Sequence, residues 1–179
     1  DFSMSGMAYD ANGNILSMKH RGLKLTTSAT IDSLVYNYIV NSNKLLNVID
    51  GQNDPDTKLG DFRTSELHPN SGSKNSSSVD YVYDGNGNMV KDLNKDIINF
   101  NGNNGIGYNF LNLPSTITVK KDGSNNKGTI VYTYDAVGTK LKKTVNEPGV
   151  DTTVTLYMGN IVFSYNTIET MKIKVRFIE

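Results

Sequence analysis

The stretch Tyr9-Asp10-Ala11-Asn12-Gly13-Asn14-Ile15 occurs again as Tyr83-Asp84-Gly85-Asn86-Gly87-Asn88-Met89. A third, degenerate copy is Tyr134-Asp135-Ala136-Val137-Gly138-Thr139, which continues to Leu141. A phrase that recurs along a chain is typical of an array of similar units, each of which buries its apolar face against its neighbours. The repeat therefore predicts an array, and it indicates that function lies in the assembled surface rather than in a catalytic cluster.

The Asp-x-x-Gly element within each copy predicts a tight turn. Asp is favoured at the first position of a type I turn, where its carboxylate accepts hydrogen bonds from nearby backbone N–H groups. Gly is favoured at the fourth position because the backbone there takes a positive φ. Such a turn, followed by a left-handed residue in a G1 bulge, is a common connection between two antiparallel strands. Each copy is therefore predicted to be one hairpin. The residues of this structural turn motif are Tyr9, Asp10, Gly13, Asn14, Tyr83, Asp84, Gly87, Asn88, Tyr134, Asp135 and Gly138.

Residues with a period of two flank these turns and predict β-strands. In residues 79–84 the odd-numbered positions are apolar or aromatic, and Asp80 and Asp84 fall between them. The same alternation occurs in residues 130–135, 34–40, 154–158 and 171–177. No segment combines an apolar helical period with capping residues. The sequence therefore predicts an all-β fold, in which consecutive antiparallel β-hairpins form a twisted, curved ribbon sheet.

The composition argues against several classes of function. The chain has 18 basic and 18 acidic residues and a formal net charge of zero, whereas a nucleic-acid partner or an anionic membrane surface requires a basic stripe or patch. No apolar run is long enough for a transmembrane helix. The absence of cysteine excludes disulfides and thiolate metal sites. A hydrophobic fraction of 37% and a mean hydropathy of −0.40 suit a sheet with one hydrated face.

The domain prediction is one repeat region over residues 1–179. Residues 50–78 form its least regular part and are expected to be a partly mobile loop insertion. They contain two prolines and the tract Asn70–Ser78, whose side chains are too small and polar to pack. The chain begins at Asp1 without an initiator Met or a signal peptide, so we expect it to be a piece of a longer protein.

The combination of motifs resembles the Rhs/YD-repeat proteins. The resemblance rests on the two Tyr-Asp-x-x-Gly-Asn copies, on Asn109-Phe110-Leu111-Asn112-Leu113-Pro114, and on Tyr134-Asp135-Ala136-x-Gly138-x-Lys140-Leu141. It runs from about Gly6 to the end of the chain, and it is strongest to the large secreted or cell-surface forms of Bacteroidetes-type bacteria. One Tyr-Asp-x-x-Gly element alone is a weak signal, but the combination is specific.

The resemblance implies a fold and a role. In that family, successive hairpins make a long ribbon that spirals into a hollow shell, which often encloses a variable C-terminal toxin domain. It implies that this chain is a non-catalytic structural module in the wall of a larger secreted or surface protein. The partners would then be the shell and the C-terminal effector of the same polypeptide. The self-cleaving Asp-Pro-rich segment of toxin-type shells is not found near Glu179, and the only Asp-Pro pair, Asp54-Pro55, lies far upstream.

An acidic loop is the strongest candidate for a metal site. Asp50-Gly51-Gln52-Asn53-Asp54-Pro55-Asp56, with Asp61 beyond it, offers several carboxylates on an irregular segment. Such oxygen ligands suit Ca²⁺, but the spacing does not match an EF-hand loop. A solvated acidic loop is the favoured interpretation, and binding of calcium stays open.

Catalytic residues and cofactors are not predicted. The repeat residues Asp10, Asp84 and Asp135 are explained by their position in the turns. The two histidines, His20 and His68, have no neighbouring ligand at metal-binding spacing, and we expect both to be surface residues.

The ten tyrosines allow two interpretations. They could form a surface on which sugars stack, so that the chain would be a carbohydrate- or partner-binding module. However, the strand tyrosines share faces with Val, Leu and Ile, and packing within or between sheets is favoured. Exposed edge strands also predict self-association. In the last segment, Lys172, Lys174 and Arg176 are expected to protect such an edge.

Overall fold

The computed structural model describes residues 2–24, 26–52, 60–167 and 174–177. It is nearly all β, with antiparallel sheets of consecutive strands, which confirms the predicted fold class. Within the described ranges the only helical element is a single 3₁₀ turn, η1 (Leu93–Lys95). No helix in this part of the chain has the length and apolar character needed to cross a membrane.

The chain forms two compact units. The first comprises Asp1–Val82 together with Leu93–Lys95, and the second comprises Tyr83–Asp92 together with Asp96–Glu179. A single ribbon region over residues 1–179 stays a prediction.

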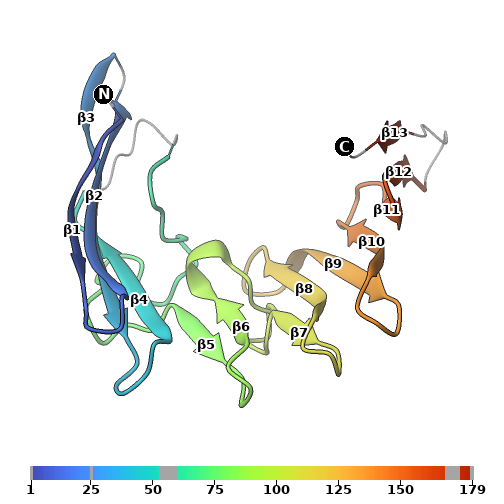
Figure 1. The fold of residues 1–179 in the computed structure, drawn as a ribbon, viewed down its shortest axis with the longest axis horizontal. Coiled ribbons are helices and arrows are strands. Elements are labelled where there is room, and N and C mark those ends of the chain that lie inside the picture. Colours follow the sequence, from blue (N-terminus) through green and yellow to red (C-terminus); the bar gives the residue numbers. More distant parts are fainter. Residues whose placement is uncertain (1, 25, 53–59, 168–173, 178–179) are drawn as a thin grey trace. The chain divides into compact units, whose positions relative to one another are not determined.

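The first unit contains a four-stranded antiparallel sheet in the order β1-β2-β3-β4 (Figure 1). Its strands are β1 (Met4–Tyr9), β2 (Ile15–Lys24), β3 (Thr27–Tyr38) and β4 (Leu45–Asp50). β4 pairs antiparallel with β3. The preceding strand begins at Thr27, earlier than its alternating pattern from residue 34 indicated.

The core of the first unit lies on one face of this sheet. Ile31, Leu34 and Val48 are 1%, 5% and 2% exposed. A side chain at Gly22 in β2 would overlap Ile31, so the core depends on the absence of a Cβ there. β1 is the edge strand of the sheet farthest from β4, and every residue of β1 is exposed.

Two short strands, β5 (Tyr81–Tyr83) and β6 (Met89–Asp92), form a two-stranded sheet joined by the second copy of the repeat turn. η1 follows β6 directly. The hairpin predicted at the second copy of the repeat is therefore confirmed, and β5 is shorter than the alternation over residues 79–84 indicated.

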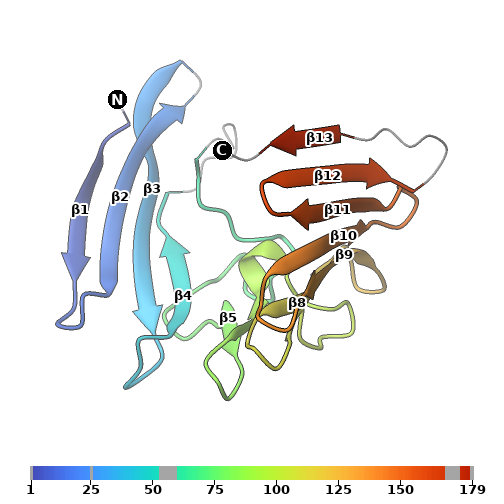
Figure 2. The same ribbon diagram turned by 45° about the vertical axis from the view of Figure 1, so that its right-hand side comes forward.

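The second unit contains a seven-stranded antiparallel sheet in the order β13-β12-β11-β10-β9-β8-β7. Figure 2 shows β10, β11, β12 and β13 side by side. The strands are β7 (Ile106–Tyr108), β8 (Pro114–Lys120), β9 (Asn126–Tyr134), β10 (Lys140–Asn146), β11 (Thr153–Met158), β12 (Ile161–Asn166) and β13 (Lys174–Phe177).

Residues 121–125 connect β8 to β9, which pair as a hairpin. Pro114 is the first residue of β8, a position that proline tolerates. The charged last segment does end the sheet, since β13 pairs only with β12 among the described strands. Lys172 lies outside the described residues.

The polar tract over residues 70–78 is anchored to the first sheet through its backbone, although its residues 71–73 and 75–77 are exposed. The Asn47 side chain on β4 is fully buried. Its Nδ2 lies 3.3, 3.3 and 2.6 Å from the carbonyl oxygens of Asn75, Ser76 and Ser78. A buried amide on a neighbouring strand therefore satisfies the backbone at the end of the tract, which the composition of the tract did not indicate.

Replacing Gly105 by Ala tests the packing of the second unit. A Cβ on Gly105 would overlap the backbone of Ile97, which cannot move aside as a flexible side chain can. We expect the free energy of unfolding to fall by about 2 kcal/mol or more. Gly123→Ala is the control, because nothing lies near its Cβ, and it should change stability by less than about 0.5 kcal/mol. Equal effects in chemical denaturation would contradict this packing.

Candidate functional site

The first copy of the repeat is a turn held by one carboxylate. Asp10 Oδ1 accepts hydrogen bonds from the backbone N–H groups of Asn12 (2.9 Å) and Asn14 (2.8 Å). Asp10 Oδ2 accepts another from the side-chain amide of Asn14 (2.8 Å). Gly13 N–H donates to the Asp10 carbonyl at 3.1 Å, and Gly13 has a φ of 84°. The Asp, Gly and Asn residues of the motif therefore each have a defined role in the turn.

The second copy repeats this geometry. Asp84 Oδ1 accepts from the N–H groups of Asn86 (2.9 Å) and Asn88 (2.8 Å), and Asp84 Oδ2 from the Asn88 side chain (3.0 Å). Gly87 has a φ of 87°. The aspartate is thus engaged by its own loop, as the sequence predicted.

The degenerate third copy keeps the backbone part of the geometry. Asp135 Oδ1 accepts from the N–H groups of Val137 (3.0 Å) and Thr139 (2.8 Å), and Gly138 has a φ of 88°. Val137 and Thr139 replace the two asparagines of the other copies, so this turn has no side-chain amides to offer.

The three aspartates share a lowered pKa. The main cause is the side-chain hydrogen bond from Asn14 for the pKa of Asp10 and the backbone N–H of Thr139 for that of Asp135. For Asp84, desolvation is the largest effect and raises the pKa, but the hydrogen bonds from Asn88, Asn86 and Gly87 together outweigh it. All three turns therefore favour the ionised carboxylate.

A fourth turn of the same kind starts at Asn109. Its Oδ1 accepts from the N–H groups of Leu111 (2.9 Å) and Leu113 (3.0 Å), as the repeat aspartates do. Asn112 takes the place of Gly with a φ of 56°. This turn was not predicted from the sequence. The signal for a turn was present, because Asn can replace both Asp and a left-handed Gly.

Asparagine side chains link one turn to the next. The Nδ2 groups of Asn12 and Asn14 lie 3.1 and 2.9 Å from Asn43 Oδ1, in the β3–β4 turn. In the second unit, the Nδ2 groups of Asn86 and Asn88 lie 3.0 and 3.1 Å from Asn112 Oδ1. The same pair of repeat positions therefore binds a later turn in both units.

Tyrosine hydroxyls make a second link between consecutive hairpins. Tyr38 donates to the Ile15 carbonyl at 2.9 Å. Tyr108 donates to the Met89 carbonyl at 2.7 Å. Tyr134 donates to the Pro114 carbonyl at 2.9 Å. Each of these tyrosines immediately precedes a turn, and each acceptor is the residue that follows an earlier turn, namely the turns that begin at Asp10, Asp84 and Asn109.

The packing of the strand tyrosines favours a structural role. Burial raises the pKa of the Tyr38, Tyr108 and Tyr134 hydroxyls, so each stays a hydrogen-bond donor. All tyrosines of the described residues are half-buried except Tyr9, which is 54% exposed. No row of fully exposed tyrosines lines either sheet in this part of the chain.

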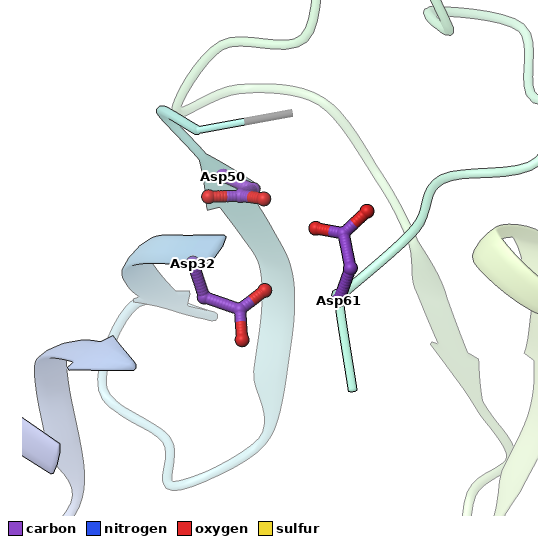
Figure 3. Close-up of side chains that lie close together, drawn as sticks. All are labelled: Asp32, Asp50 and Asp61. Carbon is purple, nitrogen blue, oxygen red and sulfur yellow. The ribbon is translucent and has the colours of Figure 1, made fainter. Parts of the chain in front are cut away.

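The structure brings Asp50 and Asp61 of the predicted acidic loop together with Asp32, which the sequence analysis missed. One carboxylate oxygen from each lies within 4.8 Å of the others. Figure 3 shows that they come from β3, the end of β4 and the segment after residue 60. Asp54 and Asp56, which also belonged to the predicted calcium loop, lie outside the described residues.

Two of these carboxylates have hydrogen-bond or ion-pair partners within the protein. Asp32 binds the Phe62 N–H (2.7 Å) and lies 3.2 Å from His20 Nδ1. Asp61 forms an ion pair with Arg63 at 2.9 Å. We assign no metal to this cluster.

Asp50 is the least compensated member of the cluster. Its Oδ1 accepts from the N–H groups of Ser33 (2.8 Å) and Gln52 (2.9 Å), but its Oδ2 is buried without a hydrogen-bond partner. Desolvation, with a smaller contribution from the charge of Asp32, raises the pKa of Asp50.

The histidines are not the surface residues that we predicted. His20 is half-buried beside Asp32. His68 is 3% exposed, and its Nδ1 accepts the N–H of Asn70 at 2.9 Å. The prediction for His68 is wrong because a turn around residues 68–71, which composition did not indicate, folds it inward.

No family model matches the chain, and no curated protein matches it. The likeness to the Rhs/YD-repeat proteins therefore rests on the motif residues.

Removing the Tyr108 hydroxyl tests the link between hairpins. Tyr108→Phe leaves the Met89 carbonyl without its donor, so we expect the second unit to lose about 1 kcal/mol of stability. Tyr9→Phe is the matched control, because its hydroxyl contacts only the exposed sulfur of Met7, and it should have no measurable effect. Similar losses in both variants, measured by urea denaturation, would show that the hydroxyl does not couple the hairpins.

The pH dependence of stability tests the state of Asp50. Because its pKa is raised on folding, Asp50 binds its proton more tightly in the folded state, and its favourable contribution is lost as pH rises through the folded pKa. Asp50→Asn keeps an acceptor oxygen and removes the charge, so it should be at least as stable as the wild type at neutral pH. Its relative gain should shrink below about pH 4.

Asp10→Asn is the control, because its effect on stability should change with pH in the opposite direction. The lowered pKa of Asp10 gives stability that is present above the unfolded pKa and is lost in acid. This variant should be destabilised at neutral pH, and the difference should shrink in acid. Thermal melting of both variants between neutral and acidic pH measures the effects, and parallel curves would refute both assignments.

Proposed function

We propose that this chain is a non-catalytic structural module of the Rhs/YD-repeat type, which forms part of the wall of a larger secreted or cell-surface protein. The observation that carries the proposal is the recurrence of one turn geometry at Asp10, Asp84 and Asp135. Recurring units that each need a neighbour are typical of walls and scaffolds.

The links between turns support this role. Asparagine amides and tyrosine hydroxyls join the turns at Asp10, Asp84 and Asn109 to a later hairpin through bonds that a single hairpin could not make. A wall needs such coupling, because isolated two-stranded hairpins are marginally stable in water.

The chemistry of the repeat aspartates supports a role without catalysis. Their carboxylates accept two or three hydrogen bonds from their own turn, and their pKa values are lowered. A general acid or base at neutral pH needs a pKa shifted in the other direction. We propose that the module acts by enclosing or displaying a C-terminal effector of the same polypeptide.

A second candidate function is carbohydrate binding by the first unit. A hollow of about 610 Å³ is lined by polar groups that include Asp10, Asn12 and Asn43 and by the rings of Tyr36 and Tyr38. Aromatic faces beside carboxylate and amide groups are suited to sugars, but this hollow is open. A glycan array, with Tyr36→Ala as the comparison, tests this function directly.

Limited proteolysis of the full natural polypeptide, analysed by mass spectrometry, tests the proposed wall. We expect the segment after Glu179 to survive in the native protein and to be digested once mild denaturant opens the wall. Tyr108→Phe should lower the denaturant concentration at which digestion begins, whereas Tyr9→Phe should not. Immediate digestion of that segment while residues 1–179 resist would refute an enclosing wall and favour an open display or binding module.

A further inference from the structure

Asp80, in the first unit, is fully buried among polar groups that the repeat does not explain. Its Oδ2 accepts from Lys74 Nζ (2.7 Å), Asn94 Nδ2 (2.8 Å) and the Val48 N–H (2.9 Å). Its Oδ1 lies 3.1 Å from His68 Nε2, but in a direction that makes no hydrogen bond. The alternation of residues 79–84 gave no sign that this aspartate is the most buried acid in the segment.

Lys74 is buried beside a carboxamide. Its side chain is 9% exposed, and besides Asp80 its Nζ donates to Asn94 Oδ1 at 2.9 Å and to Thr64 Oγ1 at 3.1 Å. The ring of Phe62 lies 5.6 Å from the same nitrogen. These contacts hold an amine that is usually solvated at one place inside the unit.

The orientation of the Asn94 amide follows from its neighbours. Lysine can only donate, so the Asn94 oxygen must face Lys74, and the Asn94 nitrogen then faces the acceptor Asp80. Asn94 is 3% exposed. One carboxylate oxygen, Asp80 Oδ2, therefore touches both the lysine nitrogen and the amide nitrogen.

This arrangement is more than an ion pair requires. A buried Lys–Asp pair is satisfied by its own charges and hydrogen bonds, and an adjacent carboxamide adds a carbonyl carbon within reach of the amine. A lysine that loses its proton to a carboxylate in a dry site is a nucleophile. The leaving nitrogen of the amide also needs a proton, and the same carboxylate is in contact with it.

We propose that Lys74 and Asn94 form an intramolecular isopeptide bond, with Asp80 as the acid–base group. Lys74 Nζ gives a proton to Asp80 Oδ2 and attacks Asn94 Cγ. The new Nζ–Cγ bond forms, and the Cγ–Nδ2 bond breaks. Asp80 passes the proton to the leaving nitrogen, and the second proton lost by Lys74 follows the same route. The nitrogen therefore leaves as ammonium, and no oxidant, reductant or other co-reactant is consumed.

His68 is a positioning residue in this scheme. Its Nδ1 accepts the N–H of Asn70, so in the neutral ring Nε2 carries the proton and faces Asp80 Oδ1. This contact lies on the oxygen that Lys74 and Asn94 do not use. Asp80 Oδ2 is thereby left for proton transfer.

The bond would fix a segment that has little apolar packing of its own. It would close the chain from residue 74 to residue 94 and tie the polar tract 70–78 to η1. The chain has no cysteine, so no disulfide can do this. A cross-link of this kind stabilises a fold mainly by restricting the unfolded chain.

The intact mass of the purified, folded chain under denaturing conditions tests the proposal. We expect the mass to be lower than that of the sequence by one molecule of ammonia, and tandem mass spectrometry to find a peptide branched between Lys74 and Asn94. Lys74→Arg, Asn94→Ala and Asp80→Ala should each restore the full mass.

Succinimide formation at Asn-Gly pairs, such as Asn12-Gly13, would also release ammonia. A mass loss that persists in Lys74→Arg or that reverses in mild alkali would come from this reaction and would overturn the proposal. Gly51→Ala, outside the cluster, is a control that should keep the mass loss.

The wild-type result does not depend on whether the variants fold. Circular dichroism shows whether the wild-type chain is folded as a β-sheet protein. If the folded wild-type chain keeps its full mass after prolonged incubation, the proposal is wrong and the cluster is only a buried ion pair. His68→Ala should slow the loss of ammonia during refolding without abolishing it, and an unchanged rate would remove His68 from the scheme.

Discussion

The carboxylate at the start of each repeat turn is the interaction on which the remaining links depend. One oxygen of Asp10 or Asp84 holds two backbone N–H groups, and the other holds the amide of the asparagine after the glycine. With a positive φ at the glycine, this fixes the turn and directs its asparagine side chains outward. The same geometry places the next residue, Ile15 or Met89, so that its carbonyl meets a tyrosine hydroxyl from the following hairpin.

The residues of the turn motif therefore have two structural roles, one within a hairpin and one between hairpins. Asp and Gly act within a hairpin, whereas the asparagines act both within their turn and between hairpins. Of the motif tyrosines, Tyr134 adds a hydroxyl bond to an earlier hairpin. The degenerate copy at Asp135 shows that the two can be separated, because it keeps the turn but has Val137 and Thr139 where the linking asparagines would be. Coupling between neighbouring units is the basis of stability in repeat proteins. The proposed wall would be held together by the same kind of coupling.

Sequence patterns predicted the elements that local chemistry determines. Turns at Asp10, Asp84 and Asp135, and the strands beside them, follow from residue preferences within a few positions. The turn at Asn109 was missed because Asn replaces both Asp and Gly there. The burial of His68 and Asp80, and the meeting of Asp32 with Asp50 and Asp61, depend on contacts between segments distant in the chain. No period or spacing encodes such contacts, so only the folded structure reveals the two polar clusters.

Native-state hydrogen exchange in the second unit tests most directly whether neighbouring hairpins are coupled. The amides of Asn88 and Leu113 are both bonded to the side chain that begins their own turn, Asp84 and Asn109. Coupled hairpins predict that, as denaturant is raised, these two amides come to exchange through one shared opening with the same free energy and the same denaturant dependence. Separate openings across the whole denaturant range, with one turn exchanging at much lower free energy than the other, would contradict the account.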